Sequence, residues 1–182
     1  MSKTKLLIIG YSSFVRRRIE PSLKKNKLFE YCISSKSNKI NTNKKILYNN
    51  YEEALKKFAP EIVYISTVNS LHYDYAKKIL NKGFNVIVDK PVTLNIKATK
   101  TLLKIAKEKK LLLAEATLFN YHRVFDIMKR LCNGINQIEH IQSNLNHPLV
   151  RSPREIAKIN GDCESDMSPY AAAIIRLFIK NN

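Results

Sequence analysis

Residues 64–91 decide the fold, and they read YISTVNSLHYDYAKKILNKGFNVIVDKP. An apolar, β-branched run over 61–66 leads into this stretch and predicts a strand. A helical spacing of apolar residues follows over 69–82, and Gly83 stands where the end of a helix favours a residue with positive φ. A second apolar run over 84–88 follows at once. We therefore predict strand, helix and strand, which is a parallel crossover unit because a tight turn cannot join parallel strands.

The same alternation continues on both sides of this unit. Further strands are predicted at residues 5–9, 28–34, 46–48 and 111–114, and further helices at 14–23, 51–58, 96–109 and 119–131. The buried face of the helix at 69–82 is expected to hold Leu71, Tyr75, Ala76, Ile79 and Leu80. This order predicts an α/β fold with a doubly wound parallel sheet of the Rossmann type over residues 1–118. Residues 119–182 are expected to form a linker helix and a short remnant of an α+β domain, with an antiparallel strand at 137–146 and a helix at 168–180.

The basic composition limits the classes of partner. The chain of 182 residues carries a formal charge of +17, but its lysines come in scattered pairs beside helical apolar positions. This favours solvated helix faces over a nucleic-acid site. The three cysteines lie far apart, which indicates reduced thiols and no metal site. Because the first apolar run is too short for a signal peptide or a membrane span, we expect a cytoplasmic protein that binds neither nucleic acid nor a membrane.

The turn after the first predicted strand lies where a dinucleotide-binding fold has its glycine-rich loop. It reads GYSSFV over residues 10–15 and keeps only the first glycine of G-x-G-x-x-G. The free N–H groups and the positive dipole end of the next helix still suit a phosphate. Cofactor contacts are therefore expected from Gly10, Ser12, Ser13 and Phe14. An ordinary strand-to-helix turn is the alternative.

The end of the second predicted strand bears on the choice of cofactor. Folds that prefer NAD(H) carry an acidic residue there, which binds the ribose 2′-hydroxyl. Here Ser34, Ser35 and Lys36 occupy this place. A hydroxyl followed by a cation suits a 2′-phosphate, so we expect NADP(H) in preference to NAD(H), held by Ser35 and Lys36. A polar loop with an incidental lysine is the alternative.

Two motifs in the opening stretch resemble those of one oxidoreductase family. Residues 65–72 are similar to its T-P-N-x-x-H segment, with Val68 in place of the proline. Residues 86–91 are similar to the strand that ends in E-K-P one helix later, with Asp89 in place of the glutamate. Two motifs in phase across a strand, a helix and a strand are far more specific than either alone. The chain thus resembles the glucose-fructose oxidoreductase and inositol dehydrogenase family, Gfo/Idh/MocA.

The resemblance extends through most of the chain. Residues 115–122 are similar to the family's E-A-x-M-Y-R-x-H segment, with Asn120 replacing the usual arginine. Residues 161–170 are similar to its G-G-G-x-x-x-D-x-G-x-Y/H stretch, although Asp162 and Cys163 stand where glycines are common.

The resemblance implies an oxidoreductase that transfers hydride between the cofactor and a ketone or alcohol of a sugar or nucleotide sugar. Lys90, at the carboxyl end of a parallel strand, would polarise the carbonyl, with a surface lysine as the alternative. Tyr170 would donate the proton, although an aromatic residue there also fits packing. Asp166 is the third candidate catalytic residue: it shares a helical face with Tyr170 if the helix begins as early as Asp166, and is otherwise an N-cap.

Other site residues are also implied by the resemblance. Cofactor contacts are expected from Thr67, Asn69, His72, Asp89 and Lys90, and substrate contacts from Asn120 and His122. For His72 we expect a structural contact or a contact with the cofactor ribose in preference to proton transfer. For His122 a structural role is the alternative, because a lone histidine on an apolar helix is commonly satisfied by a neighbour.

The end of the sequence leaves three interpretations open. In the family, the strand near 137–146 begins a large antiparallel sheet, whereas this sequence ends at Asn182. The chain could be part of an enzyme completed by another chain or by a homo-oligomer, a compact variant with a shallow site, or a noncatalytic module for dinucleotide or protein binding. The retained Lys90, His72, Asp166 and Tyr170 favour the first two, and the incomplete glycine loop favours the third.

Overall fold

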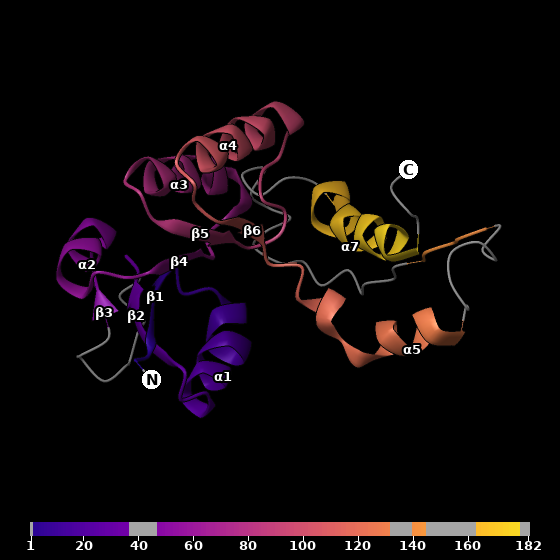
Figure 1. The fold of residues 1–182 in the computed structure, drawn as a ribbon, viewed down its shortest axis with the longest axis horizontal. Coiled ribbons are helices and arrows are strands. Elements are labelled where there is room, and N and C mark those ends of the chain that lie inside the picture. Colours follow the sequence, from indigo (N-terminus) through magenta and orange to yellow (C-terminus); the bar gives the residue numbers. More distant parts are fainter. Residues whose placement is uncertain (1, 37–46, 132–139, 145–162, 179–182) are drawn as a thin grey trace. The chain divides into compact units, whose positions relative to one another are not determined.

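The computed structural model describes residues 2–36, 47–131, 140–144 and 163–178 (Figure 1). The chain divides into two compact units, residues 1–115 and residues 116–182. The boundary predicted from the sequence lies after residue 118.

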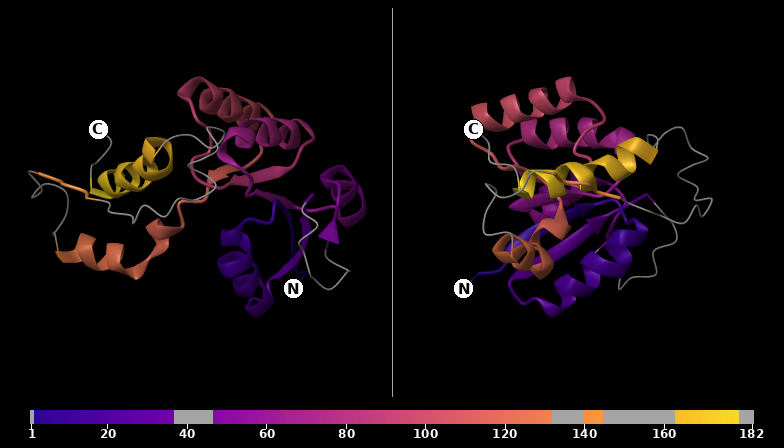
Figure 2. Two further views of the ribbon diagram at one scale, coloured as in Figure 1. Left: turned by 180° about the vertical axis from the view of Figure 1, so that it is seen from behind. Right: turned by 90° about the vertical axis from the view of Figure 1, so that its right-hand side faces the viewer.

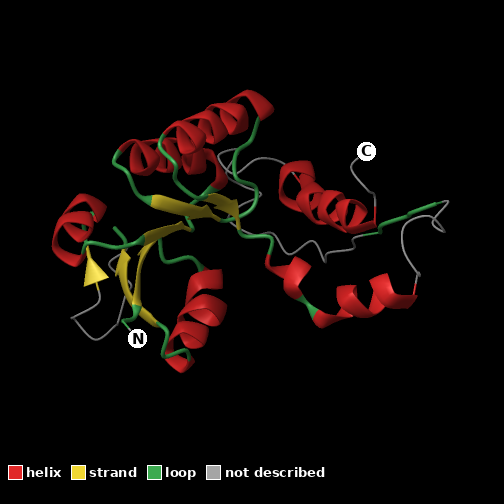
Figure 3. Ribbon diagram, in the orientation of Figure 1, coloured by secondary structure: helices red, strands yellow, loops and turns green. Residues whose placement is uncertain are grey.

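The first unit is built on a parallel sheet of six strands in the order β3-β2-β1-β4-β5-β6 (Figure 3). The strands are β1 (Thr4–Ile9), β2 (Phe29–Ser34), β3 (Leu47–Tyr48), β4 (Ile62–Ile65), β5 (Asn85–Val88) and β6 (Leu113–Glu115). The chain adds strands on one side of β1 and then returns to add β4 on the other. This reversal is the switch point of a doubly wound fold, which confirms the predicted Rossmann-type α/β class.

Helices cover both faces of this sheet. They are α1 (Glu20–Lys25), α2 (Tyr51–Phe58), α3 (Asn69–Asn81) and α4 (Ile96–Glu108). The main core contains the strand residues Leu7, Ile9, Val63, Ile65, Val86 and Val88 and side chains of α2, α3 and α4. Because strand side chains alternate, Ile8, Ile33 and Tyr64 face the other way, and they are buried as well. On that side of the sheet lies α1, opposite α3 and α4 (Figures 1 and 2).

Two local predictions in the first unit need correction. The helix predicted at 14–23 begins with a π-helical turn, η1 (Val15–Ile19), in which the Glu20 N–H bonds to the Val15 carbonyl. Pro21 lies in the first turn of α1, where a missing N–H costs little. Leu71, predicted on the buried face of α3, is 41% exposed. His72 is buried instead, because the helix presents residues 72, 76, 79 and 80 to the core.

The second unit contains η2 (Leu118–Tyr121), α5 (Arg123–Leu131) and α7 (Cys163–Phe178). The single helix predicted at 119–131 is wrong, because His122 is extended at ψ 130 and separates η2 from α5. The last helix begins before residue 168, so Asp166 lies within α7 and is not its N-cap. Of the strand predicted at 137–146, residues 140–144 are described, and they carry no strand. Residues 161 and 162 of the glycine-rich segment lie outside the described residues.

Within the described ranges, none of the helices is both long and apolar enough to cross a lipid bilayer.

Gly10 is expected to be the glycine on which the first unit depends most. A Cβ at this position would overlap the Ser66 carbonyl oxygen, and the φ of Gly10 is +97°. Gly10→Ala should lower the free energy of unfolding by about 3 kcal/mol, because a positive φ and an overpacked contact both oppose the methyl group. The measurement is urea denaturation of the full chain.

Gly83→Ala is the matched control. Gly83 has a φ of +88°, but beyond its chain neighbours no atom of the described residues lies within 4 Å of the place that a Cβ would take. Only backbone strain remains there, so the loss should be about 1 kcal/mol. Equal losses for the two variants would contradict the steric role assigned to Gly10.

Candidate functional site

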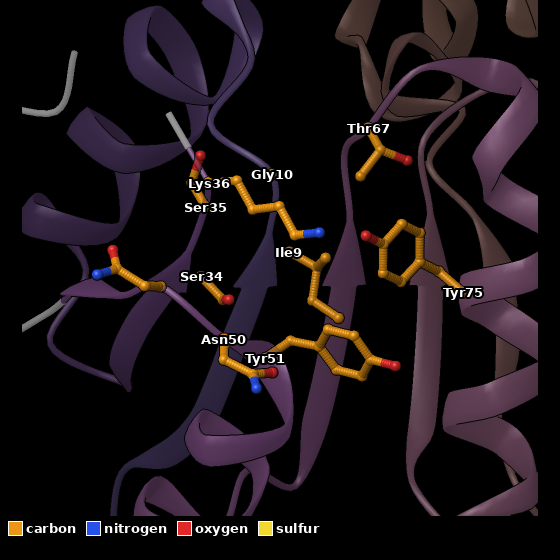
Figure 4. A pocket seen from close by; sticks show the side chains of 10 residues that line it. Ile9, Gly10, Ser34, Ser35, Lys36, Asn50, Tyr51, Thr67 and Tyr75 are labelled. Carbon is orange, nitrogen blue, oxygen red and sulfur yellow. The ribbon is translucent and has the colours of Figure 1, made fainter. Parts of the chain in front are cut away.

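A pocket of about 460 Å³ opens at the carboxyl ends of the strands next to the switch point (Figure 4). Its lining comes from the ends of β1 and β2, the segment after β3, the segment after β4, and α3. The residues are Ile9, Gly10, Ser34, Ser35, Lys36, Asn49, Asn50, Tyr51, Thr67 and Tyr75. In open α/β sheets this crevice is where ligands bind.

The pocket brings together some of the predicted cofactor residues. Gly10, Ser35, Lys36 and Thr67 line it. In Figure 4, Ser35 and Lys36 lie on one side and Thr67 on the other. The remaining predicted cofactor residues do not line this pocket; they are Ser12, Ser13, Phe14, Asn69, His72, Asp89 and Lys90. Their contact with a cofactor stays a prediction.

Sequence reasoning missed four polar or aromatic residues of the lining, namely Asn49, Asn50, Tyr51 and Tyr75. A signal existed for the first three, because they follow the third predicted strand and so had to emerge at the same sheet edge. Asn50 also caps α2, accepting the Glu52 N–H at 2.9 Å. Tyr75, predicted to face the core, packs against the core and lines the pocket as well.

Tyr51 and Tyr75 form an aromatic wall on one side of the pocket. Their rings meet edge to face, with centroids 5.4 Å apart. Burial, followed by the Glu52 carboxylate, raises the pKa of Tyr51 to about 12. The phenol therefore stays neutral at physiological pH and can offer both apolar area and a hydrogen bond.

The turn after β1 is fixed at its beginning and along its length. The Gly10 N–H donates to the Ser34 carbonyl at 2.8 Å, which joins the turn to the end of β2. The Val15 N–H donates to Ser12 Oγ at 3.1 Å, so this serine caps the first helix. Tyr11 Oη donates to Glu20 Oε2 at 2.6 Å and anchors the turn to α1.

Glu20 is a buried carboxylate beneath this turn, with only 5% of its surface exposed. Besides the Tyr11 hydroxyl, it binds Lys24 Nζ at 2.9 Å and faces Tyr31 Oη at 3.5 Å. Burial alone would raise the pKa of Glu20, but the hydrogen bonds from Tyr11 and Lys24 outweigh it, and the pKa is lowered. The ionised form is thus the one that the fold stabilises.

The loop that carries Lys90 is held from several directions. His72 is fully buried, and its Nδ1 lies 2.8 Å from the Pro91 carbonyl oxygen. Its Nε2 lies 3.3 Å from the Thr67 carbonyl oxygen. The Val92 N–H donates to Glu115 Oε2 at 2.9 Å. His72 therefore ties the loop after β5 to the segment after β4, which supports the structural role for this residue.

The predicted residues of the second unit have contacts within that unit. The ring of Tyr170 packs on Phe119, with centroids 5.0 Å apart. His122 Nδ1 accepts the Val124 N–H at 3.2 Å at the start of α5. The Asn120 N–H donates to the Thr117 carbonyl at 3.0 Å. The catalytic roles of Tyr170 and Asp166, and the substrate contacts of Asn120 and His122, remain predictions.

Residues 4–117 match the Gfo/Idh/MocA oxidoreductase family, described as having an NAD-binding Rossmann fold. The chain belongs to this family. The match covers the sheet, the turn after β1 and the loop of Lys90, and it confirms the resemblance inferred from the two motifs.

Three relatives illustrate the range of the match. Trans-1,2-dihydrobenzene-1,2-diol dehydrogenase of Xenopus laevis is 23% identical over 71% of this chain and 40% of its own length. D-xylose 1-dehydrogenase (NADP(+)) 2 of Haloferax volcanii is 24% identical over 72% of this chain and 42% of its own length. A 3-ketoreductase from Actinomadura kijaniata, solved in complex with NADP and TDP-benzene, shares the fold with a TM-score of 0.63 and 23% identity over 74% of this chain and 43% of that chain. The chain spans about two fifths of the length of these curated relatives.

The Glu20 carboxylate is expected to make stability depend on acidity. Because its folded-state pKa is lowered, its contribution is present at neutral pH and is lost as the pH falls through the folded-state pKa. In Glu20→Gln the free energy of unfolding should be lower at neutral pH and should fall less steeply between about pH 6 and about pH 3. Urea denaturation across this range measures the difference. Parallel curves for wild type and variant would contradict the assignment.

Proposed function

We propose that this chain binds NADP(H) and serves as the cofactor-binding part of an oxidoreductase for a sugar-like ketone or alcohol. One observation carries the proposal: the pocket at the switch point is lined by Ser35 and Lys36 at the end of β2, where an NAD-preferring fold has a carboxylate. A 2′-phosphate would be repelled by a carboxylate and attracted by the ammonium group of Lys36.

The residues present fit a dinucleotide. Gly10 brings the backbone of the turn against the Ser66 carbonyl, with no room even for a methyl group, and so provides the tight turn for which a dinucleotide-binding loop uses its first glycine. Tyr51 and Tyr75 supply an apolar wall next to Lys36. The name of the Haloferax volcanii relative specifies NADP(+), which agrees with this choice of cofactor.

When bound, the cofactor supplies or accepts a hydride at its nicotinamide ring. In the reducing direction the carbonyl oxygen of the substrate would gain negative charge and would need a proton. Lys90 would stabilise the negative charge that develops on that oxygen. Tyr170 would provide the proton. Lys90 belongs to the first unit and Tyr170 to the second, so their joint action is a prediction from the family motifs.

The substrate class is proposed from the family and its relatives. The relatives named above include a xylose dehydrogenase and a ketoreductase solved with a TDP derivative. A polyhydroxylated substrate or a nucleotide sugar fits this class. A homo-oligomer or a second chain stays a proposal for the substrate side.

Lys36 is expected to determine the preference for NADPH over NADH. Lys36→Ala should weaken NADPH binding by about tenfold or more, because a hydrogen bond to a charged group contributes about 1.5–3 kcal/mol. NADH affinity should stay the same, since NADH has no 2′-phosphate. Fluorescence titration of the full chain with each dinucleotide measures both affinities.

Lys100→Ala is the control for loss of a positive charge, because Lys100 is exposed on α4 and does not line the pocket. It should leave both affinities as in wild type. Absence of saturable NADPH binding by the wild-type chain would reject the proposed function. Equal losses for NADPH and NADH in Lys36→Ala would reject the role of Lys36.

Lys90→Met tests the chemical role of the lysine. Methionine keeps most of the apolar stem and removes the charge. With a sugar alcohol and NADP(+), kcat should fall by about a hundredfold or more, which is the usual effect of removing one group that stabilises an oxyanion. Formation of NADPH, followed by its absorbance, gives the rate. An unchanged kcat would exclude the electrostatic role.

A further inference from the structure

A continuous chain of hydrogen bonds runs from the turn after β1 to the loop of Lys90. The Val15 N–H donates to Ser12 Oγ at 3.1 Å. Ser12 Oγ lies 2.9 Å from Ser66 Oγ, and Ser66 Oγ donates to Asp89 Oδ2 at 3.0 Å. The other carboxylate oxygen, Asp89 Oδ1, accepts the Lys90 N–H at 3.2 Å. Three adjacent strands, β1, β4 and β5, are thereby joined at their carboxyl ends.

The hydroxyl groups in this series of hydrogen bonds can donate in only one direction. Ser66 Oγ donates to Asp89 Oδ2, so the single hydroxyl hydrogen of Ser66 is used in that bond. Ser66 Oγ must then accept from Ser12. Ser12 in turn accepts from the Val15 N–H. Every donor points toward the carboxylate, an arrangement in which each bond polarises and strengthens the next.

The central residue of this chain is shielded from water. Ser66 is 2% exposed. Its N–H donates to the Ile9 carbonyl at 2.9 Å, and its own carbonyl lies against Gly10. A hydroxyl in such a place cannot exchange its partners for solvent, so its two hydrogen bonds depend on the positions of Ser12 and Asp89.

We propose that Ser66 is a positioning residue that couples the dinucleotide-binding turn to the loop of Lys90. The inference rests on the proposed function, in which the turn holds the cofactor's diphosphate. Ser12 stands where the glycine-rich loop of this fold has its second glycine. Its side chain therefore adds a link that a glycine cannot make. A phosphate that accepts a hydrogen bond from the Val15 N–H or the Ser12 hydroxyl changes the hydrogen bond that Ser66 accepts from Ser12. The bond from Ser66 to the Asp89 carboxylate changes in turn, and this carboxylate accepts the Lys90 N–H.

The test asks whether a change at Ser12 alters the surroundings of Lys90 through these hydrogen bonds, in the full protein chain without cofactor. Amide NMR of Ser12→Ala should show a shifted Lys90 resonance compared with wild type, although residue 12 has no direct bond to residue 90. In the Ser66→Ala background, the same change at Ser12 should leave the Lys90 resonance in place. Ser22→Ala is the control: it removes a serine hydroxyl that bonds the Arg18 carbonyl in the first helix, outside this set of bonds. It should not move Lys90 in either background.

NADPH titration supplies the second readout. Ser12→Ala and Asp89→Asn should each weaken NADPH binding by about fivefold, and the double variant by about fivefold as well, because both break the same chain. A loss of about twenty-five-fold in the double variant would mean independent sites and would overturn the coupling. If Ser66→Ala does not fold, Asp89→Asn serves as the second background for the NMR test.

The outcomes separate the two proposals. The coupling would be overturned if Ser12→Ala left the Lys90 amide resonance unchanged. It would also be overturned if Ser12→Ala shifted this resonance equally with and without the Ser66 hydroxyl, whatever the result of the NADPH titration. A shift of the Lys90 resonance that depends on the Ser66 hydroxyl, together with no NADPH binding, would support the coupling through Ser66 and reject the proposed function.

Discussion

The contact between Gly10 and the carbonyl of Ser66 sets the geometry on which the first unit depends. At this point β1 and β4, neighbours in the sheet, end together. A switch point needs room for a ligand, but it also needs two strand ends that do not drift apart. The missing side chain of Gly10 allows the backbones to touch. The pocket, the turn and the end of β4 all take their positions from this contact.

The turn shows how a dinucleotide fold can lose its later glycines and keep its shape. Serine replaces the second glycine, and its hydroxyl caps the helix that the turn opens. Tyr11 adds a bond to the buried Glu20. A glycine-rich loop has few side chains to hold it, whereas this turn is held by its own side chains. Rigidity is thus supplied before any ligand arrives, at the cost of hydrogen-bonding groups that a ligand could have used.

Most of the first unit could be predicted from the sequence, because parallel strands and their crossover helices leave strong periodic patterns. The strands β1, β2, β4 and β5 came from such runs, and the glycine after α3 marked its end. The pocket was found only in part: Lys36 followed from its place after a strand, but Tyr75 did not, because an aromatic residue on a helix gives the same signal in a core and in a pocket wall. His72 was ambiguous for a similar reason. The second unit was predicted less well, because one extended residue, His122, divides the predicted helix without any change in the apolar pattern of the sequence.

The π-helical turn η1 gives Glu20 its inward direction. A turn closed by bonds from residue i to i+5 holds one residue more than an α-helical turn. Every side chain after it is therefore rotated by about 100° about the helix axis compared with an uninterrupted α-helix. In that uninterrupted helix, the Glu20 carboxylate would be rotated by about this angle from the direction in which it meets Tyr11 and Tyr31 here. The extra residue thus shifts the register of the side chains that follow it. The anchoring of the turn after β1 therefore depends on the number of residues in the helix as well as on their identity.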